Sequence, residues 1–419
     1  MPLPLSLGES TPLANQVAGH EGVMSDASGS LVIKPALPRE IAFYQMLNSA
    51  SREDSIRQLK PFIPKFFGTL RLEGQLSSSG DLQKAEGKEQ VPESVVIENL
   101  SYAFAHPNIL DVKLGTVLYG PDASEEKKSR MDKQARETTT HETGIRLTGC
   151  QTWHSPTQKY IITPKSFGKS ISSSQLPSGM IRFFPLPSDS ISSLVVPPSP
   201  APTTASTTGA GESHLPSIAE SSSSHAVDST TEIPLTPLSA DQSSESYSNH
   251  AITPSLLVKV LDLVLLEINN LITVLSELEI RFVGGSVLIV YEGDPAKLSE
   301  SIDRYEAKKA IKALKATESP RLETQRSAFS DDGSVDSNDD ESTSDADDDE
   351  EDEDEDDGID DGTKEDEKLM KKCPPVRVKM IDFAHTWLAE GEGPDQGVLK
   401  GLNTLKGLIE SRKKEVEST

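Results

Sequence analysis

The sequence predicts an α+β protein in which one two-lobed domain is interrupted by two disordered insertions. Strand-like apolar runs and amphipathic helical segments occur on both sides of each insertion. The insertions are residues 188–250, rich in Ser, Thr and Pro, and residues 319–373, rich in acids. Segments of either composition bury too little apolar surface to offset the entropy of ordering. The remaining chain, about 300 residues, is long enough for one domain with a substantial core.

The acidity of the chain is concentrated in the second insertion and says little about the active surface. The 419 residues carry a formal net charge of −26, and residues 331–367 alone contain 23 acids and one lysine. The rest of the chain is therefore close to neutral. Residues 347–357 form an unbroken acidic run that repels itself and is expected to be disordered.

The cysteines and the apolar stretches predict a protein of a reducing compartment without a transmembrane segment. Cys150 and Cys373 show neither metal-ligand nor disulfide spacing. The first residues lack a basic region followed by an apolar core, so no secretory signal is expected. The longest apolar stretch, residues 256–278, is interrupted by polar residues at helical spacing. This pattern predicts an amphipathic helix packed on the core, with Thr253 as N-cap and Pro254 at its first position.

The N-terminal part predicts a glycine-containing hairpin. Residues 1–15 show no periodicity and are expected to fray, with order beginning near Gln16. Residues 17–22 and 30–34 have the composition of two strands joined by a turn, and the second strand ends on Lys34. Such a hairpin can cover nucleotide phosphates with Lys34 reaching them, and an ordinary hairpin fits the same pattern.

A helix is predicted directly after this lysine, over residues 38–47. Glu40 lies in its first turn and can pair with Lys34, as a strand lysine and a helix glutamate do in protein kinases. The alternative is a solvated acid that the helix dipole favours. Strands follow at 62–72 and 95–97, and the second emerges into Glu98-Asn99-Leu100. That exit resembles a hinge whose backbone binds an adenine edge, but it equally fits an edge strand leaving its sheet.

The stretch PNILDVKLG, residues 107–115, places an acid and a base two positions apart in an apolar run. In an extended strand Asp111 and Lys113 share one face, and the apolar residues between and around them point into the protein. A carboxylate beside an ammonium group can orient a hydroxyl and neutralise a phosphate. An amphipathic strand with two solvated charges is the alternative.

A basic helix is predicted soon after this strand, over residues 123–136 with Ser124 as N-cap. Lys127, Arg130 and Gln134 recur at helical spacing and lie on one face. Such a face suits a ligand with several phosphates, whereas a merely solvated helix would distribute its charges without regard to face.

In the C-terminal part, the sequence predicts a strand that ends on a carboxylate and an imidazole. Three strands are predicted at 144–153, 280–291 and 376–386, with a polar connection at 163–170 and a final helix after Asp395. The last of these strands delivers Asp382 and His385. A carboxylate is the hard oxygen ligand that a magnesium ion bridging nucleotide phosphates requires.

These segments together resemble the inositol polyphosphate kinase family. Its signature P-x-x-x-D-x-K-x-G is met by Pro107, Asp111, Lys113 and Gly115, and the chain continues with ASEEK, GIRLTG, SFGKS, GSVLIVYEG and MIDFAHT. Within the family the motifs are most similar to the fungal multikinases. The resemblance implies a two-lobed kinase-like fold, related to ATP-grasp proteins and protein kinases, with a small helical substrate-binding insertion. In GSVLIVYEG only Ser286 and Leu288 match the usual family pattern, so no chemistry is assigned to that strand.

The resemblance also implies roles for individual residues. Asp111 and Lys113 are the implied catalytic pair, with Asp111 at the attacking hydroxyl. Lys34, Glu40, Glu98, Leu100 and Asp382 are implied to bind ATP, and Asp382 to hold Mg²⁺. The implied substrate contacts are Asp111, Lys113, Lys127, Arg130, Gln151, Lys165 and His385.

The implied organisation divides the chain into seven segments. They are a flexible N-terminus (1–15), an N-terminal lobe (16–100), the start of the C-terminal lobe (101–187, with the inositol-binding helical segment at 122–140), the first insertion (188–250), a second part of that lobe (251–318), the acidic insertion (319–373) and its last part (374–419).

The implied activity is transfer of the γ-phosphoryl of ATP to inositol tris- and tetrakisphosphates, leading to the pentakisphosphate. The alternatives are an inositol hexakisphosphate kinase, an inositol trisphosphate 3-kinase, or a nuclear transcription-associated scaffold acting through the acidic segment. The expected partners are inositol phosphates, transcription factors through the insertions, and phosphoinositides at membranes as further substrates. Direct nucleic-acid binding is not expected. A monomer in nucleus and cytoplasm is expected.

Deletion of residues 319–373 tests whether the acidic segment is an insertion. The implied kinase activity is expected to remain, because such a segment contributes nothing to the core. Activity assays and thermal unfolding of the deletion variant check this expectation. Loss of folding would contradict it.

Overall fold

The computed structural model describes residues 10–13, 22–71, 75–76, 82–83, 93–189, 251–326 and 374–419. Side chains are described throughout these ranges except at 75–76, 82–83, 312 and 315–326. Residues 17–21 of the expected first strand and the segments 190–250 and 327–373 lie outside the described residues, so the disorder expected in those two segments is not tested.

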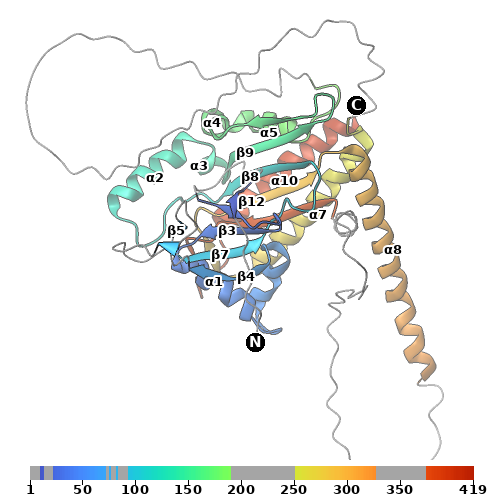
Figure 1. The fold of residues 1–419 in the computed structure, drawn as a ribbon, viewed down its shortest axis with the longest axis horizontal. Helices are drawn as coiled ribbons and strands as arrows, with labels where there is room; N and C mark the ends of the chain where they lie inside the picture. The colour runs from blue at the N-terminus through green and yellow to red at the C-terminus, as the bar shows by residue number, and fades with distance from the viewer. Residues whose placement is uncertain are drawn as a thin grey trace, which may run out of the picture.

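The expected α+β class is confirmed by two antiparallel five-stranded sheets with helices around them (Figure 1). The N-terminal sheet has the order β1-β2-β3-β7-β4, and the C-terminal sheet the order β10-β9-β8-β12-β13. Two small two-stranded sheets, β11-β14 and β5-β6, complete the set found in the described residues.

The N-terminal part contains β1 (Thr11–Pro12), β2 (Met24–Ser25), β3 (Leu31–Pro35), α1 (Pro38–Ser49), the 3₁₀ helix η1 (Ser55–Phe62), β4 (Phe66–Arg71), β5 (Gln75–Leu76), β6 (Leu82–Gln83) and β7 (Glu93–Glu98). Two boundaries differ from the expectation. The strand expected at 62–72 begins only at Phe66, because Pro61 and its neighbours form the 3₁₀ turn. Thr11 and Pro12, within the segment expected to fray, pair with β2.

The C-terminal part begins with β8 (Pro107–Leu114), α2 (Glu125–Glu137), α3 (Thr140–Thr143), β9 (Ile145–His154), β10 (Lys159–Thr163), α4 (Lys165–Ser170), the 3₁₀ helix η2 (Ser173–Gln175) and α5 (Leu176–Phe183). After the first gap come α7 (Pro254–Glu277), β11 (Ile280–Phe282), β12 (Ser286–Glu292) and α8 (Pro295–Arg326). After the second gap come β13 (Val376–Ile381), β14 (Thr386–Leu388) and α10 (Gln396–Glu417).

Three predicted segments of this part are corrected by the structure. The single strand expected at 280–291 is two strands in different sheets, because Gly284 adopts φ +75° and turns the chain between them. The polar connection expected at 163–170 contains the short helix α4. The strand expected at 376–386 ends at Ile381, and residue 386 already belongs to β14.

Three of the predicted helix starts have a capping side chain, whereas α1 begins at Pro38 without one. Thr253 Oγ1 accepts a hydrogen bond from Leu256 N, and Pro254 occupies the first position of α7. Ser124 caps α2 and Asp395 caps α10 in the same way. A cap of this kind satisfies a backbone N–H that the first turn leaves unpaired. Helix α8 continues to Arg326, beyond the boundary expected at 318, and projects away from the body (Figure 1).

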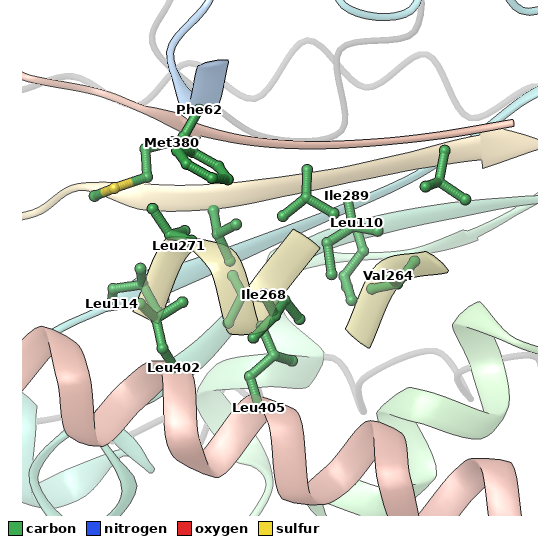
Figure 2. Packing of buried hydrophobic residues seen from close by; sticks show 14 of the residues in the cluster. Phe62, Leu110, Leu114, Val264, Ile268, Leu271, Ile289, Met380, Leu402 and Leu405 are labelled. Carbon is green, nitrogen blue, oxygen red and sulfur yellow. The ribbon is translucent and has the colours of Figure 1, made fainter. Parts of the chain in front are cut away.

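One continuous apolar core joins the two sheets and the helices α1, α7 and α10. Figure 2 shows α7 side chains such as Leu271 between strand residues such as Met380 and the α10 residues Leu402 and Leu405. All four side chains are fully buried. This core fixes β8 and β13, whose ends carry the candidate site. Among the described residues, no helix has the length and apolarity needed to cross a membrane.

The core position of α7 can be tested with one pair of variants. Leu271→Ala is expected to lower the free energy of unfolding by about 2–5 kcal/mol, because the 0 % exposed side chain leaves a cavity between layers. Leu266→Ala on the same helix, where the side chain is 39 % exposed, is expected to change it by less than about 1 kcal/mol. Chemical denaturation of both variants measures the difference. Equal losses would mean that the buried face of α7 is wrongly placed.

Candidate active site

Lys34 is the centre of an ion-pair network between the two sheets. Its Nζ lies 2.6 Å from Asp382 Oδ1 and 3.0 Å from Glu40 Oε1, and the three side chains are mostly buried. Burial lowers the pKa of Lys34, but the carboxylates of Asp382 and Glu40 outweigh it and leave the pKa above its ordinary value. The ammonium group therefore stays charged. The predicted pair of Lys34 and Glu40 is present, and its contact with ATP remains a prediction.

Asp382 reaches this network from a constrained turn directly after β13. Its φ is +68°, in the left-handed region that few residues other than glycine adopt. Glu40 supports the turn, because its Oε1 accepts a hydrogen bond from Phe383 N at 3.4 Å. The Phe383 ring packs against Phe43 and Tyr44 of α1, with ring centroids 4.4 and 5.4 Å apart. Helix α1 thus holds both the carboxylate and its lysine partner.

Lys113 of β8 contacts the other oxygen of the same carboxylate. Its Nζ lies 3.4 Å from Asp382 Oδ2. It also donates to the Gly284 carbonyl at 2.6 Å and to Ser286 Oγ at 3.3 Å. Burial raises the pKa of Asp382, but the charges of Lys34 and Lys113 outweigh burial and leave the pKa below its ordinary value. The carboxylate is therefore an anion held between two ammonium groups.

Asp111 shares the face of Lys113, as the two-residue spacing predicts, but it is far less exposed than a solvated charge. Only 4 % of the side chain is exposed, and its Oδ1 has no hydrogen-bond partner among the described residues. Burial, opposed by Lys113 and reinforced by the charge of Asp382, raises the pKa of Asp111 to about 6. A hydrogen bond from Ser286 and the charge of Lys165 act in the opposite direction. The amphipathic alternative with two solvated charges is therefore wrong for Asp111.

Two residues near Asp111 were not predicted from the sequence. Arg146 of β9 lies opposite Lys113 and is 8 % exposed, and its Nη1 is buried without a hydrogen-bond partner among the described residues. Its charge interacts with that of Asp111, while burial lowers its pKa. Ser286, to which no chemistry was assigned, contacts both Asp111 and Lys113. The sequence signal for Arg146 was its place in GIRLTG, but only strand pairing brings it to the site.

His385 and Lys127 line one cavity of about 460 Å³ beside this network. Arg39 and Asp122, which form an ion pair across its rim, also line it. Burial together with the charges of Lys127 and Arg39 lowers the pKa of His385, so its imidazole is neutral at pH 7. Arg39 was not predicted, because nothing in its spacing distinguishes it from any charged residue in a first helical turn.

The other predicted substrate-binding residues differ in how exposed they are. Lys165 is exposed at the start of α4, and its charge is felt by Asp111. Arg130 is exposed on α2. Gln151 is 4 % exposed within β9, and its amide donates to the Pro107 carbonyl at 2.9 Å. This hydrogen bond gives the amide a structural partner, so a role of Gln151 in binding substrate stays a prediction without support from the geometry.

The predicted hinge lies where β7 leaves the N-terminal sheet. Glu98 is the last residue of β7, and its N–H donates to the Lys65 carbonyl at 2.9 Å. Its carboxylate forms an ion pair with Arg377 of β13. Asn99 N donates to the Ser30 carbonyl at 2.9 Å, and the Leu100 side chain is buried. The segment is thus an ordered connection between the sheets, and its contact with adenine stays a prediction.

The donor chemistry at Asp382 fits a divalent cation. Mg²⁺ is commonly held by one or two carboxylates together with nucleotide phosphates. Asp382 offers a carboxylate that already faces two cationic groups, and Asp111 adds a buried oxygen without a hydrogen-bond partner among the described residues. Asp382 is therefore the residue that would hold the ion. No cluster of three or more metal-ligating side chains occurs in the part of the chain described here.

Comparisons with known proteins indicate a kinase that acts on inositol phosphates. A family model described as "Inositol polyphosphate kinase" matches residues 94–197 and 243–410. The inositol polyphosphate multikinase of Saccharomyces cerevisiae is 32 % identical over 167 residues, which cover 34 % of this chain and 47 % of that protein. The multikinase of Schizosaccharomyces pombe is 33 % identical over 178 residues, covering 40 % of this chain and 61 % of that protein. The matched part thus spans about half the length of these curated relatives.

A solved structure of inositol phosphate multikinase Ipk2 from S. cerevisiae, in complex with ADP and Mn²⁺, is also similar. It aligns with a TM-score of 0.49 and 20 % identity over 92 % of this chain and 99 % of that chain. Because the family model covers more than half of the chain, the family is established. The chain belongs to the inositol polyphosphate kinase family.

Replacement of Asp111 tests its raised pKa. Because the folded pKa is about 6 and the ordinary value is 3.8, the folded protein binds more protons between these values. Wild-type stability therefore falls as pH rises through this window. Asp111→Asn is expected to be more stable than wild type, by on the order of 3 kcal/mol at pH 8 and by less at pH 5.

Thermal unfolding at pH 5 and pH 8 measures this difference. Asp303→Asn, on an exposed position of α8, is the matched control and is expected to behave like wild type at both values. A stability gain of Asp111→Asn that does not grow with pH would show that Asp111 titrates normally.

Proposed function

We propose that this protein is an ATP-dependent inositol polyphosphate multikinase. It would transfer the γ-phosphoryl group of ATP to hydroxyls of inositol tris- and tetrakisphosphates. The observation that carries the proposal is the arrangement of Lys34, Lys113 and Asp382, which presents two partly buried ammonium groups on either side of one carboxylate. Family membership and the multikinase names of the two yeast relatives support the choice of substrate.

The geometry suits phosphoryl transfer because that reaction depends on positioning and on stabilisation of negative charge. The transferred group passes through a loose transition state whose charge is spread over its oxygens. Lys34 and Lys113 come from different sheets, and each forms an ion pair with Asp382. A Mg²⁺ ion held by Asp382 would neutralise nucleotide phosphate charge when bound. Preorganised cations of this kind need no reorganisation when the charge develops.

Asp111 is the residue suited to the attacking hydroxyl. Its pKa of about 6 leaves most of the carboxylate ionised at pH 7 while keeping it close to the operating pH, which is the range that a general base requires. Its buried Oδ1, which has no hydrogen-bond partner in the described part of the chain, would accept a hydrogen bond from a substrate hydroxyl. Lys113, on the same face, would contact the phosphoryl group and the substrate together.

Recognition of a polyphosphate is consistent with the cationic residues around the cavity. Lys127 and Arg39 line it together with His385, and Lys165 contributes positive potential at Asp111. These groups come from α1, α2 and α4, so they surround the site from several directions. A ring with several phosphates offers a separate anionic group to each of them. A neutral sugar would offer these cations no anionic group.

Product identification from inositol trisphosphate tests the proposal directly. Wild-type protein with ATP and Mg²⁺ is expected to yield tetrakis- and pentakisphosphate, separated by ion-exchange chromatography. Asp111→Ala and Asp382→Ala are each expected to lower turnover at least about 10²–10³-fold, since each removes a group from the charge network. Asp303→Ala, exposed on α8, serves as the control and should keep wild-type activity.

The outcomes separate the alternatives within the family. A single tetrakisphosphate product would indicate a 3-kinase, and pyrophosphate products from the hexakisphosphate would indicate a hexakisphosphate kinase. Full activity in both alanine variants would mean that the site is wrongly assigned. No phosphorylation of any soluble inositol phosphate would refute the proposed function.

A further inference from the structure

Strand β13 has two different faces. Val376, Val378 and Met380 are buried in the core, at 8 %, 2 % and 0 % exposure. Arg377 and Lys379 alternate with them and are only partly buried. Since successive side chains of a strand point to opposite faces, these two cations lie together on the face away from the core.

Both cations contact the N-terminal part of the chain. Arg377 Nη1 forms an ion pair with Glu98 Oε1, at the end of β7. Lys379 Nζ donates a hydrogen bond to the Pro61 carbonyl of η1. Asp382, in the turn directly after the strand, pairs with Lys34 of β3. Strand β13 and the turn after it are therefore bonded to the N-terminal part at three successive points.

The ion pair of Arg377 and Glu98 is partly buried. Their side chains are 18 % and 26 % exposed, so solvent screens their attraction less than that of surface pairs. Burial on its own raises the pKa of Glu98, but Arg377 and a hydrogen bond from Lys65 N outweigh it and leave the pKa below its ordinary value. Glu98 is therefore an anion whose position is set by Arg377.

We propose that Arg377 is a positioning residue for the nucleotide, which it affects through Glu98. The proposal rests on the proposed function, because it takes residues 98–100 as the adenine contact. Arg377 and Asp382 stand five positions apart, about 17 Å along an extended chain. One strand thus fixes the adenine end of the site at Arg377 and the phosphate end at Asp382. The separation of the two ends is then set by a rigid sheet and not by a mobile connection.

A positioning role predicts a particular kinetic pattern. Arg377→Gln is expected to raise the KM for ATP about 10-fold, the equivalent of losing one partly buried ion pair. The turnover at saturating ATP should change by less than about threefold, since the charges around the reacting group remain in place. The KM for the inositol phosphate should not change. Isothermal titration with ATP and Mg²⁺ measures the same loss of affinity without catalysis.

Charge reversal distinguishes positioning from simple loss of packing. Glu98→Arg alone should weaken ATP binding as Arg377→Gln does, whereas the double variant Glu98→Arg/Arg377→Glu should recover most of the affinity. Arg377→Lys, which keeps the charge, should recover part of it. Arg71→Gln is the matched control, because Arg71 pairs with Glu93 at 3.2 Å at the opposite end of β7. It should leave ATP binding unchanged.

The outcomes separate this inference from the proposed function. If wild-type protein binds no ATP, both the proposed function and the inference that rests on it are refuted. If wild type binds ATP and Arg377→Gln binds it equally well, the inference is overturned and the function stands. A lower melting temperature with unchanged KM for ATP would show a structural role only and would also overturn it. If Arg377→Gln does not fold, the reversed pair decides, because recovered affinity supports the inference and its absence overturns it.

Discussion

The carboxylate of Asp382 lies between Lys34 and Lys113, and the arrangement of the other site residues depends on it. Removing charges from water is costly, and their attraction offsets that cost only when each charge has a partner. Lys34 has Glu40 as a second partner, and Lys113 has the Gly284 carbonyl. Loss of Asp382 would remove the ion pairs that join it to both lysines. The network therefore requires β3, α1, β8 and the end of β13 to keep their relative positions.

Two carboxylates of the site have pKa values shifted in opposite directions, although burial raises both. Asp382 has two ammonium groups against its oxygens, so its pKa falls below the ordinary value. Asp111 is more deeply buried and has an oxygen without a hydrogen-bond partner among the described residues, so its pKa rises to about 6. Environments that separate two pKa values in this way assign different chemistry to similar groups. Asp382 is suited to a permanent negative charge, and Asp111 to the exchange of a proton.

Local sequence patterns predicted the parts of the site that depend on near neighbours. The spacing of Asp111 and Lys113 predicted their common face, and Thr253 and Ser124 predicted the starts of their helices, because strand alternation and capping act over a few residues. Residues brought in by long-range pairing were missed. Arg146 becomes a neighbour of Lys113 only through the register of β8 and β9, which includes a bulge after Asp111. The pattern of residues within either strand does not reveal how the two strands are aligned.

A break in regular structure was likewise not predictable from local sequence patterns. The apolar run 280–291 satisfied every local criterion for one strand, yet Gly284 divides it between two sheets. The division places the Gly284 carbonyl against Lys113, while β12 pairs with β8 and sets Ser286 opposite the same lysine. A continuous strand would carry residues 280–283 past the end of β8 and leave the ammonium group of Lys113 without this acceptor. The interruption is therefore part of how the fold holds a buried cation at the site.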